Sequence, residues 1–283
     1  MPFVTCVVDS TLRQVQSGQS GMAAPLVRER IVNAAAQFEV ETVQQTGSTN
    51  ADLLQRARQA QPAAPILRAA LVQTAGRGRL GRRWHASAGG ALLFSLAVPM
   101  ATADARIAAA TLACGIGAAE ALRAAGVPAL LKWPNDLLLN GRKLGGLLCE
   151  LAFDGQGRRT LVIGVGVNLR LDPATRDSIG QPAAALDETP VIATLQRETL
   201  IGRMAVAIAA ALRQFDTDGF VPLQPRFMAL FAHRGAIVDL FELGAKVASG
   251  RALGVDGEGR LLLDTGEGLR LCSGGELTMR TVT

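Results

Sequence analysis

The stretch GRGRLGRRW, residues 76–84, decides between two fold classes, because its first six residues match the G-x-G-x-x-G spacing of a dinucleotide-binding turn. Such a turn requires a helix directly after the glycines, since the helix N-terminus holds the pyrophosphate. Here the chain continues as RRWHASAGGALLFSL, which has no helical start and runs into an apolar strand. A Walker loop is excluded as well, because no Gly-Lys-Ser/Thr follows. The stretch therefore predicts a fold other than the doubly wound dinucleotide-binding one.

The same stretch is unusually basic, with four arginines at positions 77, 79, 82 and 83. Glycines leave its backbone flexible and its amides open, and guanidinium groups bind phosphate and carboxylate oxygens in pairs. A loop of this composition is predicted to fold over an anionic ligand and to exclude water from it. The alternative is a solvated basic loop without a ligand.

The composition predicts a globular protein with Ala-rich helices packed on a sheet. The chain has 283 residues, of which 49% are hydrophobic and only 4% aromatic, with no tyrosine. This length suits one large domain, or one large and one small domain. The net charge of +5 fits an anionic ligand, an acidic protein partner or nucleic acid, although a solvated basic surface gives the same balance.

Cysteine and histidine usage argues against a structural metal site. The cysteines are isolated in the sequence, and neither histidine lies at metal-ligand spacing from them. The chain has four cysteines and two histidines: Cys6, Cys114, Cys149, Cys272, His85 and His233. Reduced cysteines are typical of a cytosolic protein. The N-terminus lacks the features of a signal peptide, and apolar runs such as Ile107 to Ala119 are too short to cross a bilayer. We expect a cytoplasmic protein without a membrane partner.

Patterning along the chain predicts three regions. Residues 1–23 are expected to be a weakly ordered lead-in, residues 24–232 one large unit, and residues 233–283 a small β-barrel of evenly spaced short strands. In the large unit, Ser48 or Thr49 is expected to cap a helix, and Asn140-Gly141 to turn a hairpin. Further helices are expected at 24–37, 103–125, 193–215 and 225–231, and strands at 68–73, 91–98 and 160–169.

A second constellation is KWPNDLLLNGRKLGG, residues 132–146, which places lysines, Asn and Asp around a Trp-Pro turn and a hairpin. The alternative interpretation of this stretch is that its lysines are simply exposed and that its Trp-Pro-Asn-Asp segment is only a turn. In order along the chain, however, GSTN, QTAGRGRLGRRW, KWPNDLLLNGRKLGG and IGVGVNL resemble the biotin protein ligases over residues 47–168. The C-terminal region, which ends in GGELTMR, resembles the small SH3-like domain of that family. The resemblance implies an α/β fold, a mixed sheet flanked by helices as in class II aminoacyl-tRNA synthetases, with a C-terminal SH3-like β-barrel.

The resemblance also implies an activity. Members of this family join biotin to ATP, hold biotinyl-5′-AMP, and pass the biotinyl group to a lysine of a biotin carboxyl carrier domain, with Mg²⁺ as the metal. Neither step needs an enzyme nucleophile, and the sequence offers no convincing Ser-His-Asp or Cys-His set. The reaction does need cations placed in advance, because a carboxylate must approach a polyphosphate.

Site residues follow from the resemblance by position. Those implied for biotin are Ser48, Thr49 and Asn50 at the ureido ring, Gln73, Gly76, Arg77, Gly78 and Arg79 at the carboxylate and phosphate, and Lys143, Gly145 and Gly146. Those implied for ATP are Lys132, Asn135, Asn168 and Arg79, with Asp136 for Mg²⁺. The catalytic set is Arg77, Arg79 and Lys143. For Asp136 a turn cap, and for the two glycines a strand bulge, are alternative interpretations. Trp84 is expected to pack the closed loop.

Three further expectations concern related functions. Lipoate ligases and octanoyl transferases share the implied architecture, but GRGRLGRRW together with KWPND and RKLGG favours biotin. A nucleic-acid-binding module would predict aromatic residues interleaved with basic ones, which the sequence lacks, so no nucleic acid is expected as a partner. Since GSTN begins at residue 47, too few residues precede it for a helix-turn-helix domain, which predicts a ligase without a repressor function.

Relatives often pair by sheet extension, so a homodimer is an open expectation.

Overall fold

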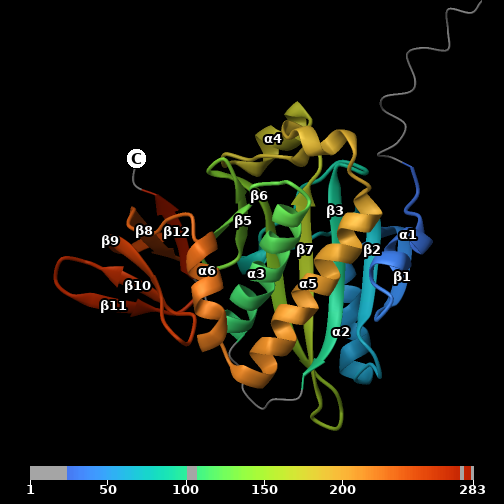
Figure 1. The fold of residues 1–283 in the computed structure, drawn as a ribbon, viewed down its shortest axis with the longest axis horizontal. Coiled ribbons are helices and arrows are strands. Elements are labelled where there is room, and N and C mark those ends of the chain that lie inside the picture. Colours follow the sequence, from blue (N-terminus) through green and yellow to red (C-terminus); the bar gives the residue numbers. More distant parts are fainter. Residues whose placement is uncertain (1–23, 101–106, 275–276, 282–283) are drawn as a thin grey trace, which may run out of the picture.

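The computed structural model describes residues 24–100, 107–274 and 277–281, which form two β-sheets with flanking helices (Figure 1). The lead-in expected at residues 1–23 lies outside the described residues, as do Cys6 and the first residues of the helix expected from 103. The larger sheet is built from residues 39–168 and the smaller one from residues 237–281.

The larger sheet is mixed and has the strand order β1-β2-β3-β7-β6-β5-β4. Its edge strand β1 pairs parallel with β2, and every other neighbouring pair of the sheet is antiparallel. The strands are β1 (Glu39–Thr46), β2 (Ile66–Gln73), β3 (Ala91–Met100), β4 (Leu130–Lys132), β5 (Asp136–Leu139), β6 (Arg142–Phe153) and β7 (Arg159–Asn168). The central strands β3 and β7 are buried along nearly their whole length, as continuous apolar runs predict.

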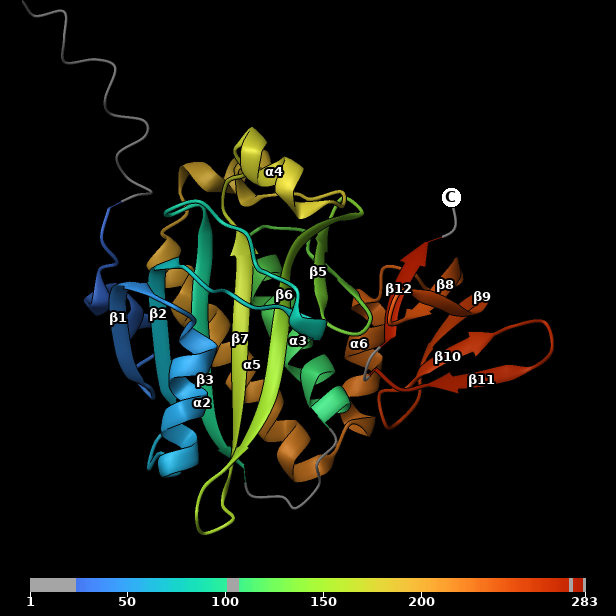
Figure 2. The same cartoon turned by 180° about the vertical axis from the view of Figure 1, so that it is seen from behind.

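Helices cover both faces of this sheet unequally. One face carries α1 (Arg28–Ala34), α3 (Ile107–Ala124), α5 (Arg197–Asp218) and α6 (Gln224–Leu230), whereas α2 (Thr49–Gln59) lies on the other face (Figures 1 and 2). Small residues allow α3 and α5 to cross closely, because a Cβ added at Gly117 would lie 2.5 Å from the carbonyl oxygen of Ala207. The Ala-rich composition is therefore used for close helix packing. The open part of the α2 face leaves room for the loop that contains residues 76–84.

Helix α3 is longer than the apolar run from Ile107 to Ala119 on which the membrane prediction was based. It extends over 18 residues with a mean hydropathy of 1.3, which is sufficient in length and composition to cross a bilayer. In the structure 72% of it is buried, between the sheet and α5. The prediction that this run is too short was wrong because it stopped at Ala119, and the burial identifies α3 as a core helix.

The smaller sheet is antiparallel with the order β11-β10-β9-β8-β12. Its strands are β8 (Ile237–Glu242), β9 (Ala245–Val255), β10 (Leu261–Asp264), β11 (Leu269–Cys272) and β12 (Leu277–Thr281). It is attached to the hairpin region of the larger sheet through Trp133, which is 1% exposed and donates its indole N–H to the carbonyl oxygen of Gly259 at 3.2 Å.

One short helix was not predicted. Helix α4 (Pro173–Ile179) lies between β7 and α5, where the sequence has no apolar period. It begins after Asp172, whose side chain accepts a hydrogen bond from the amide of Thr175 at 2.8 Å, and it ends at Gly180, which has φ 65°. Such a cap followed by a left-handed glycine is a recognisable helix signal, and it was missed because the helix is only seven residues long.

The turn between β6 and β7 depends on Asp154. Its carboxylate accepts hydrogen bonds from the backbone of Gln61, Gln156 and Arg158 and from the Arg158 side chain, at 2.8–3.1 Å. Burial by itself raises the pKa of Asp154, but these hydrogen bonds outweigh it and lower the pKa to about 2. Since the folded pKa lies below the unfolded one, the stabilisation is complete above about pH 4 and is lost as the pH falls toward 2.

We therefore expect Asp154→Asn to reduce the free energy of unfolding at pH 7, with the difference from wild type shrinking as the pH falls from about 4 to 2. Urea unfolding at a series of pH values measures this difference. Asp264→Asn is the matched control, because Asp264 accepts a backbone hydrogen bond from Gly266 in an exposed turn. A difference at Asp154 that does not change with pH would contradict the assignment.

Candidate active site

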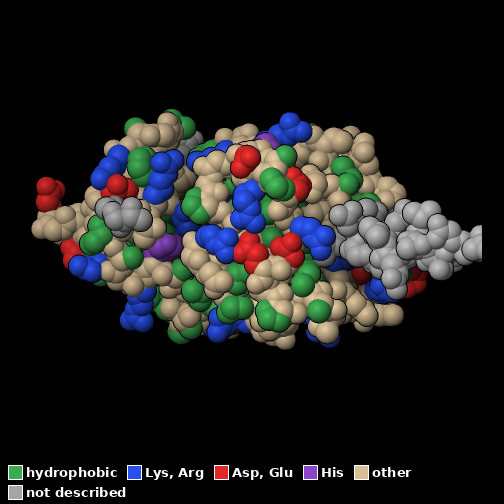
Figure 3. Space-filling view, turned by 90° about the horizontal axis from the view of Figure 1, so that it is seen from above, with side chains coloured by type: hydrophobic (Ala, Val, Ile, Leu, Met, Phe, Trp, Pro, Cys, Tyr) green, Lys and Arg blue, Asp and Glu red, His purple; other side chains and the backbone are tan. Residues whose placement is uncertain are grey.

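A cavity of about 960 Å³ lies between the loop at residues 76–85, the hairpin region of β4 to β6, and strand β12. Its charge is strongly one-sided. Among the described residues that line it there is one carboxylate, Asp136, against seven basic side chains: Arg77, Arg79, Arg82, Arg83, Lys132, Lys143 and Arg280. Figure 3 views the end of the molecule that carries α4, where Lys and Arg side chains gather with a few acidic ones near the middle of the face. The cavity is suited to a ligand with several negative charges.

The start of α2 supplies buried polar side chains to one end of the cavity. Ser48, Thr49 and Asn50 are 5%, 2% and 4% exposed, and Ser48 caps the helix as predicted by accepting a hydrogen bond from Ala51. Thr49 donates from its amide and its hydroxyl to Gln73 Oε1, at 2.7 and 3.0 Å. Its hydroxyl also lies 2.7 Å from that of Ser95. Ser95 was missed in the sequence, where its signal is a lone hydroxyl in the apolar run of β3.

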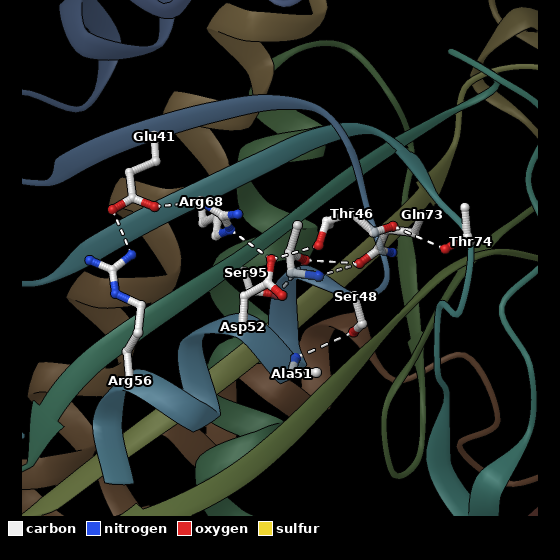
Figure 4. Close-up of polar contacts among 11 residues, drawn as sticks. Glu41, Thr46, Ser48, Ala51, Asp52, Arg56, Arg68, Gln73, Thr74 and Ser95 are labelled. Carbon is white, nitrogen blue, oxygen red and sulfur yellow. Dashed lines mark hydrogen bonds and ion pairs between the residues drawn. The ribbon is translucent and has the colours of Figure 1, made fainter. Parts of the chain in front are cut away.

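Charged residues outside the cavity fix the position of this helix start. Glu41 accepts hydrogen bonds from Arg56 and Arg68, at 2.6 and 2.7 Å, and Asp52 accepts from Arg68 and Thr46, at 2.8 and 2.7 Å (Figure 4). Burial by itself raises the pKa of Glu41, but its two arginine partners hold that pKa below its usual value. The network joins β1, β2 and α2, so the chain between Thr46 and Asp52 has little freedom to move.

The basic loop is a short hairpin closed by its own backbone. Trp84 N donates to Gly76 O at 2.9 Å, and Gly78 N donates to Arg82 O at 2.7 Å. At the tip, residues Arg79–Gly81 form a 3₁₀ turn, in which Leu80 and Gly81 have φ values of 56° and 70°. A dinucleotide-binding turn would require an α-helix directly after the glycines, and in the described structure the next regular element is strand β3. This confirms the prediction that the stretch is no dinucleotide-binding turn.

Two glycines of β7 make room for this loop and for the helix start. A Cβ added at Gly166 would lie 2.7 Å from the ring of Trp84, and one added at Gly164 would lie 2.9 Å from Asn50 Oδ1. Trp84 therefore lies directly over the sheet at Gly166, as Figure 2 shows for the course of the loop across β7 and β6. This explains the letters IGVGVN in a strand where glycine is otherwise unfavourable.

The arginines of the loop have different surroundings. Arg77 lies with Nη2 3.7 Å from Glu150 Oε2 of β6, and its side chain is 47% exposed. Arg79 donates to Asn135 Oδ1 at 3.2 Å and to the carbonyl oxygens of Gly274 and Leu277. Burial lowers the pKa of Arg79. Arg79 therefore connects the loop to both the hairpin and the smaller sheet, which its sequence position gave no reason to expect.

Lys143 and Asp136 face each other across the β5–β6 hairpin. Lys143 Nζ is 2.7 Å from Asp136 Oδ1, and Gly146 packs beside that carboxylate. The backbone of Lys143 is held on both sides by the segment after α4, because its amide donates to Pro182 O and its carbonyl accepts from Ala184 N, at 3.0 and 2.8 Å. The hairpin predicted at Asn140-Gly141 is present, with φ values of 50° and 73° at its turn, and it joins the antiparallel strands β5 and β6. The ion pair between Lys143 and Asp136 was not predicted.

Lys132 and His233 also line the cavity, and the pKa values of both are shifted by their surroundings. Burial lowers the pKa of Lys132, Asp136 raises it in part, and the charges of Lys143, Arg280 and Arg82 lower it further. Burial, and then the charge of Lys132, lower the pKa of His233 to about 4, so this imidazole is neutral at pH 7. Neither His233 nor Arg280 was singled out in the sequence. The clustered cations repel each other, and a bound anion would relieve this repulsion.

Some of the remaining predicted site residues line the cavity and others do not. Asn135 and Asn168 line the cavity, and Asn168 also donates to Ala184 O at 2.9 Å. Gly78 and Gly146 line the cavity too, whereas Gly76 and Gly145 are not among its lining residues. At Gly145 an added Cβ would lie 2.5 Å from Gly166 O, so close strand packing requires this glycine. The cavity also includes residues 179–183, which the sequence did not indicate.

The described residues contain no cluster of three or more His, Cys, Asp or Glu side chains that would form a metal site from protein groups alone. Cys114, Cys149 and Cys272 are free thiols. Asp136 is the single carboxylate that the described lining offers to a cation.

Comparisons with known proteins identify the fold and the family. Residues 42–168 match the biotin/lipoate A/B protein ligase family, and residues 240–280 match the biotin protein ligase C terminal domain. The biotin–(acetyl-CoA-carboxylase) ligase of Mycobacterium tuberculosis is 31% identical over 263 residues, which are 89% of this chain and 93% of that protein. The chain belongs to the biotin protein ligase family. The resemblance stated from the sequence motifs is thereby confirmed.

Other members of the biotin protein ligase family cover the chain to different extents. The biotin protein ligase from Aquifex aeolicus in complex with biotin and ATP has a TM-score of 0.72 and 26% identity, covering 86% of this chain and 99% of that one. The bifunctional ligase/repressor BirA of Salmonella typhimurium is 34% identical over 210 residues, or 74% of this chain. The matched part spans 65% of the length of that relative. The predicted fold class, a mixed sheet flanked by helices with a small C-terminal β-domain, is confirmed.

Proposed function

We propose that the chain is an ATP-dependent biotin protein ligase, which activates biotin as biotinyl-5′-AMP and transfers it to a lysine of a biotin carboxyl carrier domain. The observation that carries this proposal is the cavity in which seven basic side chains surround one carboxylate. A carboxylate and a triphosphate repel each other, so a site that joins them needs fixed cations around both. The names of the relatives, with biotin and ATP bound in one, support this assignment.

In the proposed first step an oxygen of the biotin carboxylate attacks the α-phosphorus of ATP. A bond forms between them, and the bond from that phosphorus to the oxygen of the leaving pyrophosphate breaks. In the second step the neutral amine of the carrier lysine attacks the acyl carbon, AMP leaves with the bonding electron pair, and the amine loses a proton. Both steps use nucleophiles supplied by substrates, so the chain acts by binding, orientation and electrostatic stabilisation.

The positions within the cavity suggest a division of these tasks. Ser48, Thr49 and Asn50 form the buried polar end that would bind the ureido ring. Lys143 and Arg77 would stabilise charge between the carboxylate and the α-phosphate. Lys132, Asn135 and Asn168 would face the nucleotide, together with Arg280. For Arg79, the contacts with Asn135 and with the smaller sheet favour a role in holding the loop in place, beside the phosphate role inferred from the motif.

Mg²⁺ is part of the proposal, with Asp136 as its protein ligand. A single carboxylate that is already paired with Lys143 fits a Mg²⁺ ion carried mainly by nucleotide phosphates and water, which is the usual manner of Mg²⁺ binding. When bound, the ion would neutralise phosphate charge.

The proposal also covers the partners and the organisation of the chain. The carrier domain follows from the names of the relatives, and the basic rim of the cavity would suit an acidic partner. We retain the division into residues 24–232 and 233–283, the cytoplasmic location, and the exclusion of nucleic acid and membrane as proposals. A homodimer by sheet extension stays a prediction. It is supported by β1, which is an edge strand of the larger sheet as far as the described residues show.

The test of the proposed function is biotin-dependent exchange of labelled pyrophosphate into ATP, with lipoate and octanoate as parallel substrates. We expect exchange with biotin alone, because the proposed pocket has polar groups for a ureido ring. Exchange with lipoate or octanoate instead would favour the sister ligases of the same fold. If none of the three acids supports exchange, the proposed adenylation is wrong.

A further inference from the structure

Glu150, on strand β6, contacts two residues of the proposed biotin site without being among the residues that line the cavity. Its Oε2 accepts a hydrogen bond from Asn50 Nδ2 at 2.5 Å and lies 3.7 Å from Arg77 Nη2. Its side chain is 32% exposed. Glu150 therefore lies outside the cavity lining and contacts two parts of the proposed site. One is the start of α2, through Asn50, which would bind the ureido ring, and the other is the basic loop, through Arg77, which would cover the ligand.

This contact determines the orientation of the Asn50 amide. A carboxylate can only accept hydrogen bonds, so the NH₂ end of the amide must face it. In the opposite orientation, Oδ1 would lie against the carboxylate oxygen and two acceptors would repel each other. The orientation leaves Asn50 Oδ1 as a buried atom without a hydrogen-bond partner among the described residues.

A buried acceptor without a partner is unfavourable unless a ligand supplies a donor. Asn50 lines the cavity, and the space above Gly164 of β7 is filled by its amide, because a Cβ added there would lie 2.9 Å from Oδ1. The amide is thus held between Glu150 and Gly164. A ureido ring carries N–H groups, which are the donors that such an acceptor requires.

We propose that Glu150 is a positioning residue for specificity, which fixes Asn50 as a hydrogen-bond acceptor and so selects ligands that present an N–H group. This inference rests on the proposed function, because it names how the biotin end of that site recognises its ligand. Glu150 itself touches no ligand. The side chain of Arg77 is about half exposed, so its weak ion pair with Glu150 adds little to this role.

The test uses calorimetric titration of biotin and of two cyclic carbamate analogues, in each of which an oxygen replaces one ureido N–H. The wild type is expected to bind one of the analogues about 10- to 100-fold more weakly than biotin, because Asn50 Oδ1 then meets an acceptor. In Glu150→Gln the neighbouring amide can donate or accept, so Asn50 can turn round. The affinity ratio of biotin to that analogue should then fall to about twofold or threefold.

Glu120→Gln is the matched control. Glu120 of α3 pairs with Arg226 of α6, and neither residue lines the cavity, so this variant should retain the wild-type ratio. Asn50→Ala provides a second variant, and it should bind biotin and the analogue with similar affinity. An unchanged ratio in either Glu150→Gln or Asn50→Ala would overturn the inference, including the case in which both ligands weaken equally. A wild type that does not bind biotin would instead refute the proposed function, before any variant is compared.

Discussion

Lys143→Met is expected to slow biotin-dependent pyrophosphate exchange by about 10²- to 10³-fold, the usual loss when one preorganised charge or donor is removed from a reacting centre. Methionine preserves most of the length and the apolar stem of lysine but removes the ammonium group. That group lies 2.7 Å from Asp136, and the Lys143 backbone is fixed by Pro182 and Ala184. The ammonium is therefore positioned before any substrate binds. Steady-state exchange kinetics at saturating biotin and ATP measure the effect.

Lys246→Met is the matched control for this variant. Lys246 forms the same type of ion pair, with Nζ 2.7 Å from Asp239 Oδ1, but it lies in the smaller sheet and does not line the cavity. Its loss should leave exchange within about twofold, as is normal for a half-exposed ion pair. Thermal unfolding of both variants shows whether the fold is retained. If Lys143→Met kept wild-type exchange, the lysine would have only a structural role.

Much of the fold could be predicted because its signals are local in the sequence. The Ser48 cap, the strand predicted at residues 68–73 and the hairpin at Asn140-Gly141 each depend on neighbouring residues. All are present, and the strand begins two residues earlier, at Ile66. The strand order was not predictable, because the place of β7 between β3 and β6 depends on long-range pairing. The segment between β7 and α5 was missed for a different reason: it has no apolar period, although residues 179–183 line the cavity.

The candidate site shows the same limit. Motif positions located Ser48, Gln73, Lys132, Asp136 and Lys143, and the structure brings all of them to one cavity. The residues that support them come from distant parts of the chain and from ordinary contexts. Ser95 lies in an apolar strand, Glu150 follows the motif at residues 132–146, and His233 follows α6. A sequence shows which side chains are unusual, but a support residue is unusual only through what it contacts.

Gly166→Ala is expected to lower kcat/KM for biotin by up to about 10²-fold, the loss that a displacement of about 1 Å can cause in an active site. A Cβ at residue 166 would lie 2.7 Å from the Trp84 ring, so the tryptophan must move. Its displacement would strain the hydrogen bond from Trp84 N to Gly76 O that closes the basic loop. Alanine is compatible with a central strand, so the sheet itself should remain intact. Exchange kinetics at varied biotin concentration measure the loss.

Tryptophan fluorescence reports the displacement directly, because the chain has two tryptophans and the other, Trp133, is 1% exposed. Gly155→Ala is the control, since an added Cβ there meets nothing within 4 Å and the turn lies away from the cavity. In a double-mutant cycle, Trp84→Ala should remove most of the additional effect of Gly166→Ala, because the clash requires the indole ring. Strictly additive effects, or an unchanged emission spectrum in Gly166→Ala, would show that the loop does not depend on the contact between Trp84 and the sheet.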